Sequence, residues 1–291
     1  MKLNYELYKV FYYVAKNLSF SKAAGELYIS QSAVSQNIKA LEKKLQTELF
    51  SRSTKNVFLT KSGRILFEHI EPAFNLIKNG EKNIEEINSL QRGEIHIGAN
   101  DTISKDFLLP YLNQFHRLYP EINIKITNRT SSRCVDLLEQ NAVDFIISNL
   151  PNKKIKDNME VREIFEFEDV FIFGDNYSKL KGKELHFKDL KDYQLLMLEK
   201  KTATRKFFDE LLADYGVEIE AAVELGSVDL LIEMAKIGLG IANVPQYSLK
   251  SDDQEIFELK IKEKLPKRKL AVVLNKNIPL SKASEKFLQL I

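Results

Sequence analysis

The 291-residue sequence predicts an α/β protein with an all-α winged helix-turn-helix head, a long helix and a two-lobed α/β body. Three observations predict this architecture. Apolar residues recur at helical spacing through the first 45 residues, a seven-residue apolar repeat follows, and short apolar strands then alternate with helices. We expect the head at 1–60, the long helix at 61–90 and the body at 91–291. Within the body, lobe I should comprise about 91–164 and 269–291, and lobe II about 165–268.

The composition describes a chain with enough apolar residues to form a core. Hydrophobic residues make up 44% and charged residues 29% of the sequence, as in ordinary globular proteins. No apolar run approaches the ~18 residues that cross a bilayer, and the N-terminal segment lacks the apolar region of a signal peptide. The one cysteine, Cys134, has no partner for a disulfide. We therefore expect a cytoplasmic protein.

The net charge of +2 hides an uneven distribution along the chain. Residues 1–64 carry eleven Lys and Arg against four Glu, a net charge of +7, which leaves −5 for the remainder. A basic head on an acidic body is typical of a protein whose one end binds a polyanion. The alternative is a basic face that is merely solvated.

The head has the pattern of a helix-turn-helix. A first amphipathic helix follows Asn4, and a second begins at Ser21 with paired alanines that allow close helix packing. Residues 28–30 form a short connection, and Ser30 is placed to cap a third helix. The apolar positions of the first and third helices are Leu7, Val10, Phe11, Val14, Leu18, Val34, Ile38, Leu41 and Leu45. This spacing predicts helix-turn-helix geometry.

Polar residues occupy the outward face of the third helix near its N-terminus. Gln can bond adenine with two hydrogen bonds, Ser can bond base edges or phosphates, and Lys can contact phosphate or guanine. The basic segment 52–56 just downstream would supply a wing for neighbouring phosphates. The alternative is the solvated face of an ordinary helix. The expected DNA contacts are Ser21, Lys22, Ser30, Gln31, Ser32, Ser35, Gln36, Lys39, Arg52 and Lys55.

These residues also carry a family resemblance. The segments SFSKAAGELYISQSAVSQNIKALEKKL (19–45), ELFSR (48–52) and LTKSG (59–63) closely resemble the DNA-binding domain of LysR-type transcriptional regulators. The resemblance covers residues 3–63 almost without gaps. Gly25 departs from it, since a helix former is usual there and Gly should cost about 1 kcal/mol relative to Ala. Ser32 stands where the family often has Pro.

The long helix should run from an N-cap at Thr60 to about residue 89. Its apolar seam consists of Leu66, Ile70, Ala73, Ile77, Gly80, Ile84 and Ile87. A seven-residue repeat of this kind indicates a coiled-coil seam, and Pro72 should kink the helix. The resemblance implies the family's linker helix, which pairs antiparallel and dimerises the heads, so we expect a homodimer or homotetramer. The alternative is that the seam packs within its own chain.

Strands and helices alternate through the body. The expected elements are strand 95–99, helix 107–118, strand 122–127, helix 132–140, strand 145–148, strand 170–173, strand 195–198, helix 205–215, strand 221–225, helix 228–237, strand 241–244, strand 270–274 and helix 281–290. Such alternation predicts parallel βαβ units. The order, with EIHIGA (94–99) and GLGIANVP (238–245), resembles the LysR-type effector domain, a two-lobed fold similar to periplasmic binding proteins.

Four segments at predicted strand ends offer hydroxyls and free N–H groups at helix starts. In such folds, ligands bind in the crevice outside the carboxyl ends of the strands. The expected effector contacts are Asn100, Thr102, Ser104, Asn128, Arg129, Thr130, Ser131, Thr202, Thr204, Arg205, Gly226 and Ser227. Arg129, Arg133 and Arg205 favour a small anion such as a carboxylate, although helix capping and surface salt bridges explain the same residues.

No enzyme motif is present in the sequence, and the four histidines lack the spacing of a metal site. We expect no cofactor, no metal and no catalysis. Cys134 could be a redox-sensing thiol if Arg133 lowered its pKa, or a small core residue. The sequence therefore predicts a transcriptional regulator that binds double-stranded DNA and responds to a small-molecule effector, with the transcription machinery as a further partner. A small-molecule receptor and a nonspecific nucleoid protein are the alternatives.

Overall fold

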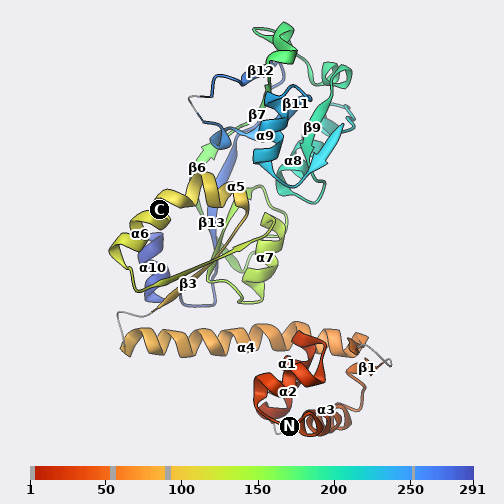
Figure 1. Ribbon diagram of the computed structural model, residues 1–291, viewed down its shortest axis with the longest axis vertical. Coiled ribbons are helices and arrows are strands. Elements are labelled where there is room, and N and C mark those ends of the chain that lie inside the picture. The colour runs from red at the N-terminus through yellow and green to blue at the C-terminus, as the bar shows by residue number, and fades with distance from the viewer. Residues whose placement is uncertain (1–3, 53–56, 89–92, 251–252) are drawn as a thin grey trace. The chain divides into compact units, whose positions relative to one another are not determined.

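The computed structural model describes residues 4–52, 57–88, 93–250 and 253–291 (Figure 1). The chain forms two compact units, Met1–Glu81 and Lys82–Ile291. The first unit contains the helical head. The second contains two β-sheets with their covering helices, so the predicted combination of a helix-turn-helix head and a two-lobed α/β body is confirmed.

Three helices build the head: α1 (Tyr5–Asn17), α2 (Phe20–Leu27) and α3 (Gln31–Leu45). Each begins at a capping side chain. Asn4, Ser19 and Ser30 accept hydrogen bonds from backbone N–H groups in the first turn of α1, α2 and α3, which satisfies donors that have no partner within the helix. The buried core joins all three helices and includes Phe11, Val14, Ala23, Val34, Ile38 and Leu41.

A two-stranded antiparallel hairpin follows α3. It consists of β1 (Phe50–Arg52) and β2 (Val57–Leu59). Glu42 fixes its start, because Oε1 accepts from the backbone N–H groups of Leu49 and Phe50 at 2.8 and 3.3 Å. The predicted wing is therefore a hairpin anchored to α3.

The long helix α4 spans Lys61–Asn88 and continues through Pro72. Thr60 Oγ1 accepts from the backbone N–H of Gly63 at 3.0 Å, as a capping residue does. Two expected seam residues, Leu66 and Ile70, pack against the chain's own head core, so the first part of the seam contacts its own chain. Farther along, the Ile77 and Ile84 side chains are 43% and 61% exposed. The Ile87 side chain lies outside the described residues.

The first sheet of the body has the strand order β4-β3-β5-β13-β6. Its strands are β3 (Glu94–Ala99), β4 (Asn123–Asn128), β5 (Phe145–Leu150), β6 (Met159–Phe167) and β13 (Arg268–Asn275). One face packs on α6 (Leu109–Leu118) and α10 (Lys282–Leu288), and the other on α7 (Ser131–Glu139). A helical path leads into α6 through α5 (Asp101–Ile103) and the π-helical turn η1 (Ser104–Leu108).

The second sheet has the order β10-β9-β11-β7-β12-β8. Its strands are β7 (Asp169–Phe173), β8 (Glu184–Leu185), β9 (Leu195–Leu198), β10 (Val223–Leu225), β11 (Ile241–Pro245) and β12 (Phe257–Ile261). Helix α8 (Ala203–Asp214) covers one face and α9 (Val228–Lys236) the other. Short 3₁₀ helices occupy Asp175–Leu180, Phe187–Asp192 and Gln246–Ser248.

Several expectations about the body need correction. The helix expected at 107 begins six residues earlier, because Asn100 Oδ1 caps it by accepting from the N–H of Ile103 at 2.8 Å. The sheets are not purely parallel, since β13 runs antiparallel to both β5 and β6, and β7 runs antiparallel to β11 and β12. Strands β6, β8 and β12 were not predicted. Their charged residues interrupt the apolar runs used to recognise strands.

Candidate DNA-recognition face and ligand cavity

The N-terminal part of α3 presents a polar face to solvent. Gln31, Ser32, Gln36 and Lys39 are exposed, and Ser35 is partly exposed. Val34 and Ile38, on the opposite side of the helix, are fully buried. The orientation predicted from the apolar spacing is therefore the one observed, and the expected contact residues of α3 lie on its accessible side.

Neighbouring side chains hold this face in place. The Ser21 hydroxyl on α2 donates to Gln31 Oε1 at 3.3 Å, which leaves the Gln31 amide nitrogen as a free donor. Ser30 Oγ accepts from the N–H of Ala33 and lies 2.8 Å from Ser32 Oγ. Ser21 and Lys22 are exposed beside α3. Arg52 ends β1, but its side chain and all of Lys55 lie outside the described residues.

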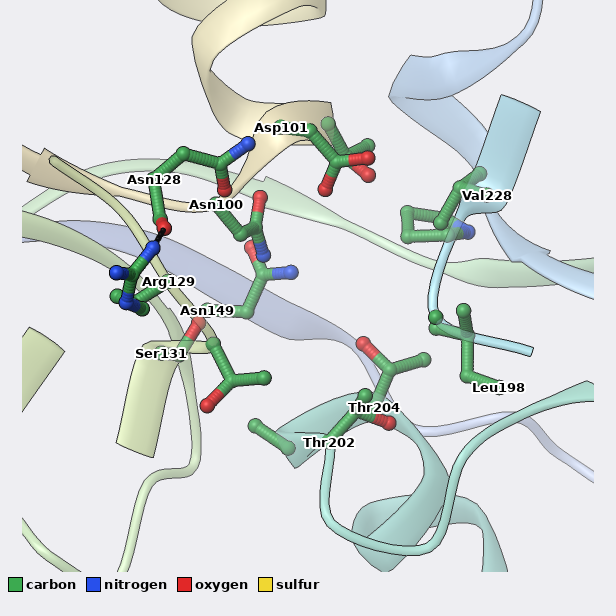
Figure 2. A pocket seen from close by; sticks show the side chains of 15 residues that line it. Asn100, Asp101, Asn128, Arg129, Ser131, Asn149, Leu198, Thr202, Thr204 and Val228 are labelled. Carbon is green, nitrogen blue, oxygen red and sulfur yellow. Dashed lines mark hydrogen bonds between the residues drawn. The ribbon is translucent and has the colours of Figure 1, made fainter. Parts of the chain in front are cut away.

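A cavity that is open to solvent lies in the body, with walls from both lobes (Figure 2), and the space between its walls, part of it open solvent, is about 610 Å³. Lobe I, which contains the sheet β4-β3-β5-β13-β6, contributes the start of α5, the end of β4, the start of α7 and the end of β5. Lobe II contributes the ends of β9 and β11 and the starts of α8 and α9. The lining residues are Asn100, Asp101, Thr102, Asn128, Arg129, Thr130, Ser131, Asn149, Leu198, Thr202, Ala203, Thr204, Gly226, Val228 and Pro245.

Most of the expected effector contacts meet at this cavity. The structure brings together Asn100, Thr102, Asn128, Arg129, Thr130, Ser131, Thr202, Thr204 and Gly226. The four segments converge because strand ends and helix starts gather at one edge of each sheet.

Three expected contacts do not line the cavity. The Ser104 hydroxyl donates to Asn100 O at 2.7 Å within the helix. Ser227 Oγ caps α9 by accepting from the N–H of Leu230 at 3.4 Å. Arg205 is 4% exposed, and its guanidinium donates to the carboxylates of Asp209 and Glu224 at 2.7 Å each. The guanidinium is therefore paired within lobe II.

Asp101 and Ala203 lie within two of the four predicted segments, although they were not among the expected contacts. Sequence reasoning missed four lining residues: Asn149, Leu198, Val228 and Pro245. Asn149 had a usable signal, because it is a polar residue near the end of a buried apolar strand. The three apolar residues, Leu198, Val228 and Pro245, carried no such signal. Their place at strand and helix ends depends on how the two lobes pack.

Hydrogen bonds with the surrounding protein determine whether several lining groups can still donate to a ligand or accept from it. Asn149 Oδ1 accepts from the Tyr247 hydroxyl at 3.1 Å, and Thr204 Oγ1 accepts from Arg268 Nη1 at 3.2 Å. The Thr202 hydroxyl donates to Glu199 O at 2.9 Å while accepting from the N–H of Arg205. Its proton is therefore not available to a ligand.

The arginines that the sequence suggested for anion binding differ in position. Arg129 lines the cavity and donates from Nη1 to Asn128 O at 2.7 Å, as Figure 2 shows. Arg133 does not line the cavity, and it forms a 3.1 Å ion pair with Asp136 on α7. Only one of the three guanidinium groups is thus placed to meet a ligand in this cavity.

Two titratable groups of lobe I have raised pKa values. Burial raises the pKa of Cys134 to about 11, and its Sγ donates to Arg129 O at 3.4 Å. The redox-thiol interpretation, which required a lowered pKa, is therefore wrong, and Cys134 is a core residue on α7. Burial also raises the pKa of Asp106, on η1, to about 6.

Within residues 4–52, 57–88, 93–250 and 253–291, no group of three or more His, Cys, Asp or Glu side chains is arranged to hold a metal ion. No helix in that part of the chain is long and apolar enough to cross a membrane.

Comparison with known proteins assigns both units. Residues 88–291 match the LysR substrate binding domain, and residues 5–64 match the bacterial regulatory helix-turn-helix proteins of the lysR family. The chain belongs to the LysR family. This LysR-family protein is a DNA-binding transcriptional regulator, with a helix-turn-helix head and a body for a small-molecule effector.

Relatives of this LysR-family regulator align along nearly the whole chain. It is 28% identical over 290 residues to the HTH-type transcriptional regulator CysL of Bacillus subtilis (strain 168), covering 99% of this chain and 96% of CysL. It is also 28% identical over 282 residues to a probable RuBisCO transcriptional regulator of Gracilaria tenuistipitata var. liui, covering 94% of this chain and 91% of that protein.

Solved structures of LysR-family regulators share the fold. A full-length OxyR variant from Pseudomonas aeruginosa has a TM-score of 0.71 at 21% identity, covering 100% of this chain and 95% of the other. CbnR in complex with its target DNA has a TM-score of 0.69 at 18% identity, covering 99% of each chain.

Proposed function

We propose that this LysR-family regulator binds its effector in the cavity between the two lobes and reads DNA with the polar face of α3. The observation that carries the effector assignment is the lining itself, because both lobes contribute polar groups to one cavity. A ligand that contacts both walls binds one arrangement of the lobes more tightly than others, and so shifts the population toward it. No catalytic step is part of this proposal.

The DNA contacts follow from the exposed face of α3. Gln31, Ser32, Ser35, Gln36 and Lys39 would contact base edges and phosphates in the major groove. Ser21, Lys22 and Ser30 flank this face, and Arg52 and Lys55 of the hairpin would reach neighbouring phosphates. The solved complex of CbnR with its target DNA supports this assignment through the shared fold.

Self-association would place two heads on one DNA site. The exposed Ile77 and Ile84 of α4 supply apolar surface for a second copy of the chain. Two heads would then bind half-sites about one helical turn apart. Effector binding would change the spacing of the heads and the bending of the DNA, with the transcription machinery of the cytoplasm as the final partner.

A gel-shift titration with the DNA upstream of the protein's own gene tests the DNA assignment. The unmodified chain should bind this DNA more tightly than a scrambled sequence, with affinity that falls as salt rises. Ser35→Glu should abolish the shift by placing a carboxylate against the DNA. Ser178→Glu makes the same chemical change at an exposed position of the body and should bind normally. Equal binding to scrambled DNA would favour a nonspecific nucleoid protein, and no binding would favour a small-molecule receptor.

Replacing cavity hydroxyls tests the effector assignment separately. Thr102→Val and Thr130→Val should preserve DNA binding in the absence of effector and weaken the response to it, because both residues line the cavity. An unchanged dose–response in both variants would remove these residues from the effector site.

A further inference from the structure

We propose that the interlobe cavity selects a small monocarboxylate. We further propose that Tyr247 and Arg268, which do not line the cavity, determine this selectivity by hydrogen bonding to residues that do. The inference rests on the proposed effector site and adds the chemical class of its ligand. It depends on which hydrogen-bonding atoms of the lining are already occupied by the protein and which remain for a ligand.

Asn100 presents a donor to the cavity. Its Oδ1 accepts from the backbone N–H of Ile103 at 2.8 Å. A backbone N–H can only donate, so the amide oxygen must point to the helix and the amide nitrogen must point elsewhere. Asn100 lines the cavity, and its nitrogen is left for a ligand acceptor.

Asn149 presents a second donor. Its side chain is buried, with the residue only 3% exposed, and Oδ1 accepts from the Tyr247 hydroxyl at 3.1 Å. Burial raises the pKa of Tyr247, so the phenol keeps its proton and remains a donor. Figure 2 shows the Asn149 amide nitrogen directed into the open space between the lobes.

Thr204 adds a hydroxyl whose oxygen already accepts one hydrogen bond from Arg268. Arg268 Nη1 lies 3.2 Å from Thr204 Oγ1 and 2.7 Å from Asp169 Oδ2. Guanidinium groups can only donate, so the Thr204 oxygen accepts with one lone pair, and its proton can donate toward the cavity. The Arg268 residue itself is 1% exposed and does not line the cavity.

The helix starts at the cavity add to this polarity. Thr130 and Ser131 begin α7, and Thr202 and Ala203 begin α8, all four in the lining. The first N–H groups of a helix have no carbonyl partner within it and carry partial positive charge. Two amide donors, the Thr204 hydroxyl, the Arg129 guanidinium and two helix starts favour a ligand group with several acceptor lone pairs and negative charge, as a carboxylate has.

The remainder of the ligand should not be anionic. Asp101 lines the cavity, and its carboxylate forms no ion pair or hydrogen bond with any described residue. The Thr202 hydroxyl donates its hydrogen bond to Glu199 O, so, like the Asp101 carboxylate, it can only accept a hydrogen bond from a ligand. Leu198, Val228 and Pro245 supply apolar surface beside them. A second carboxylate on the ligand would be repelled by the Asp101 carboxylate, whereas an apolar body would not.

Three ligands of related shape test the assignment by calorimetric titration into the full-length protein: 3-methylbutyrate, its amide 3-methylbutyramide, and the dicarboxylate 3-methylglutarate. We expect 3-methylbutyrate to bind at least about tenfold more tightly than the amide, because an amide nitrogen would meet fixed donors. We expect 3-methylglutarate to bind more weakly than 3-methylbutyrate, and Asp101→Asn to remove that difference.

Variants behind the wall test the positioning role. Tyr247→Phe removes the hydroxyl that orients Asn149, so the amide can rotate and present its oxygen. The preference for 3-methylbutyrate over its amide should then fall to about threefold or less, a change of selectivity that a general loss of stability would not produce. Tyr215→Phe makes the same chemical change on a side chain of lobe II away from the cavity and should keep the full preference.

The outcomes separate this inference from the proposed function. Thr130→Phe fills the cavity and should abolish binding of all three compounds. If the amide binds as tightly as the acid and Thr130→Phe removes both, the cavity is a ligand site but the donor assignment is overturned. If 3-methylbutyrate binds equally well to Thr130→Phe, the cavity itself is the wrong site. Failure of all three compounds to bind would overturn the monocarboxylate assignment while leaving the DNA titration unaffected.

Discussion

Arg268 and Asp169 form a buried ion pair of 2.7 Å where the chain crosses between the two lobes. Asp169 is the first residue of β7 and Arg268 the first of β13, so each begins a strand just after a crossing. The guanidinium lies over the rings of Phe167 and Phe207 and also donates to Leu150 O. One side chain thus connects both sheets and, through Thr204, the cavity wall.

We expect Asp169→Asn to destabilise the protein by about 3–5 kcal/mol, because it leaves the Arg268 charge buried without its counter-ion. Glu163→Gln is the matched control. It breaks the Lys269–Glu163 pair, which has the same 2.7 Å distance but involves side chains that are 38% and 55% exposed. Its cost should be below about 1 kcal/mol. Urea unfolding followed by circular dichroism measures both, and equal losses would contradict the structural role of the buried pair.

Asp106 predicts a dependence of stability on pH. Burial raises its pKa from 3.8 to about 6, with Lys105 and Lys250 opposing and Asp229 and Asp101 adding to the shift. Because the folded state binds this proton more tightly, the stabilisation is present below about pH 4 and is lost as pH rises through about 6. Asp106→Asn should therefore be more stable than the unmodified protein at pH 7.5, by about 2 kcal/mol, and should lose this advantage at pH 4. Urea unfolding at both pH values is the measurement, and a pH-independent difference would contradict the assignment.

Gly25 of α2 and Gly63 of α4 should respond oppositely to alanine. A Cβ at Gly25 of α2 would meet no atom within 4 Å, so Gly25→Ala should stabilise the head by about 1 kcal/mol through helix propensity. A Cβ at Gly63 would lie 2.1 Å from Leu49 O, so Gly63→Ala should destabilise it. Thermal unfolding of the two variants measures the contrast. A lower melting temperature for Gly25→Ala would contradict the open surroundings of that position.

Self-association should depend on the exposed apolar residues of α4. We expect Ile77→Glu with Ile84→Glu to convert the assembly to monomers, since charged groups would replace apolar contacts. Leu118→Glu changes an apolar side chain on α6 that is 55% exposed and should leave the assembly intact. Sedimentation velocity distinguishes the species. Dimers that persist in the double variant would place the interface elsewhere.

The head could be predicted closely from the sequence because its signals are local. Asn4 and Ser30 cap the helices they were expected to cap, and Val34 and Ile38 are buried as their spacing requires. The body was harder because its site depends on packing between distant segments. Arg205 illustrates the limit: it starts a helix beside the cavity, yet Glu224 on β10, nineteen residues away, turns its guanidinium into lobe II.

The roles of Tyr247 and Arg268 had no sequence signal. Neither lines the cavity. Tyr247 acts through Asn149, about a hundred positions away, and Arg268 acts through Thr204, about sixty positions away. From the sequence alone, the arginine at position 268 could equally lie on the surface. Only the fold shows that this guanidinium is buried and that it donates to the Thr204 oxygen.

The central claim is that occupancy of the interlobe cavity alters how α3 engages DNA. The most direct measurement is a DNase footprint of the full-length protein on the DNA upstream of its own gene, with and without a saturating cavity ligand. We expect the ligand to change the length or pattern of the footprint, and Thr130→Phe to give one footprint whether or not ligand is present. An identical footprint for the unmodified protein with and without ligand, despite binding measured by calorimetry, would contradict it.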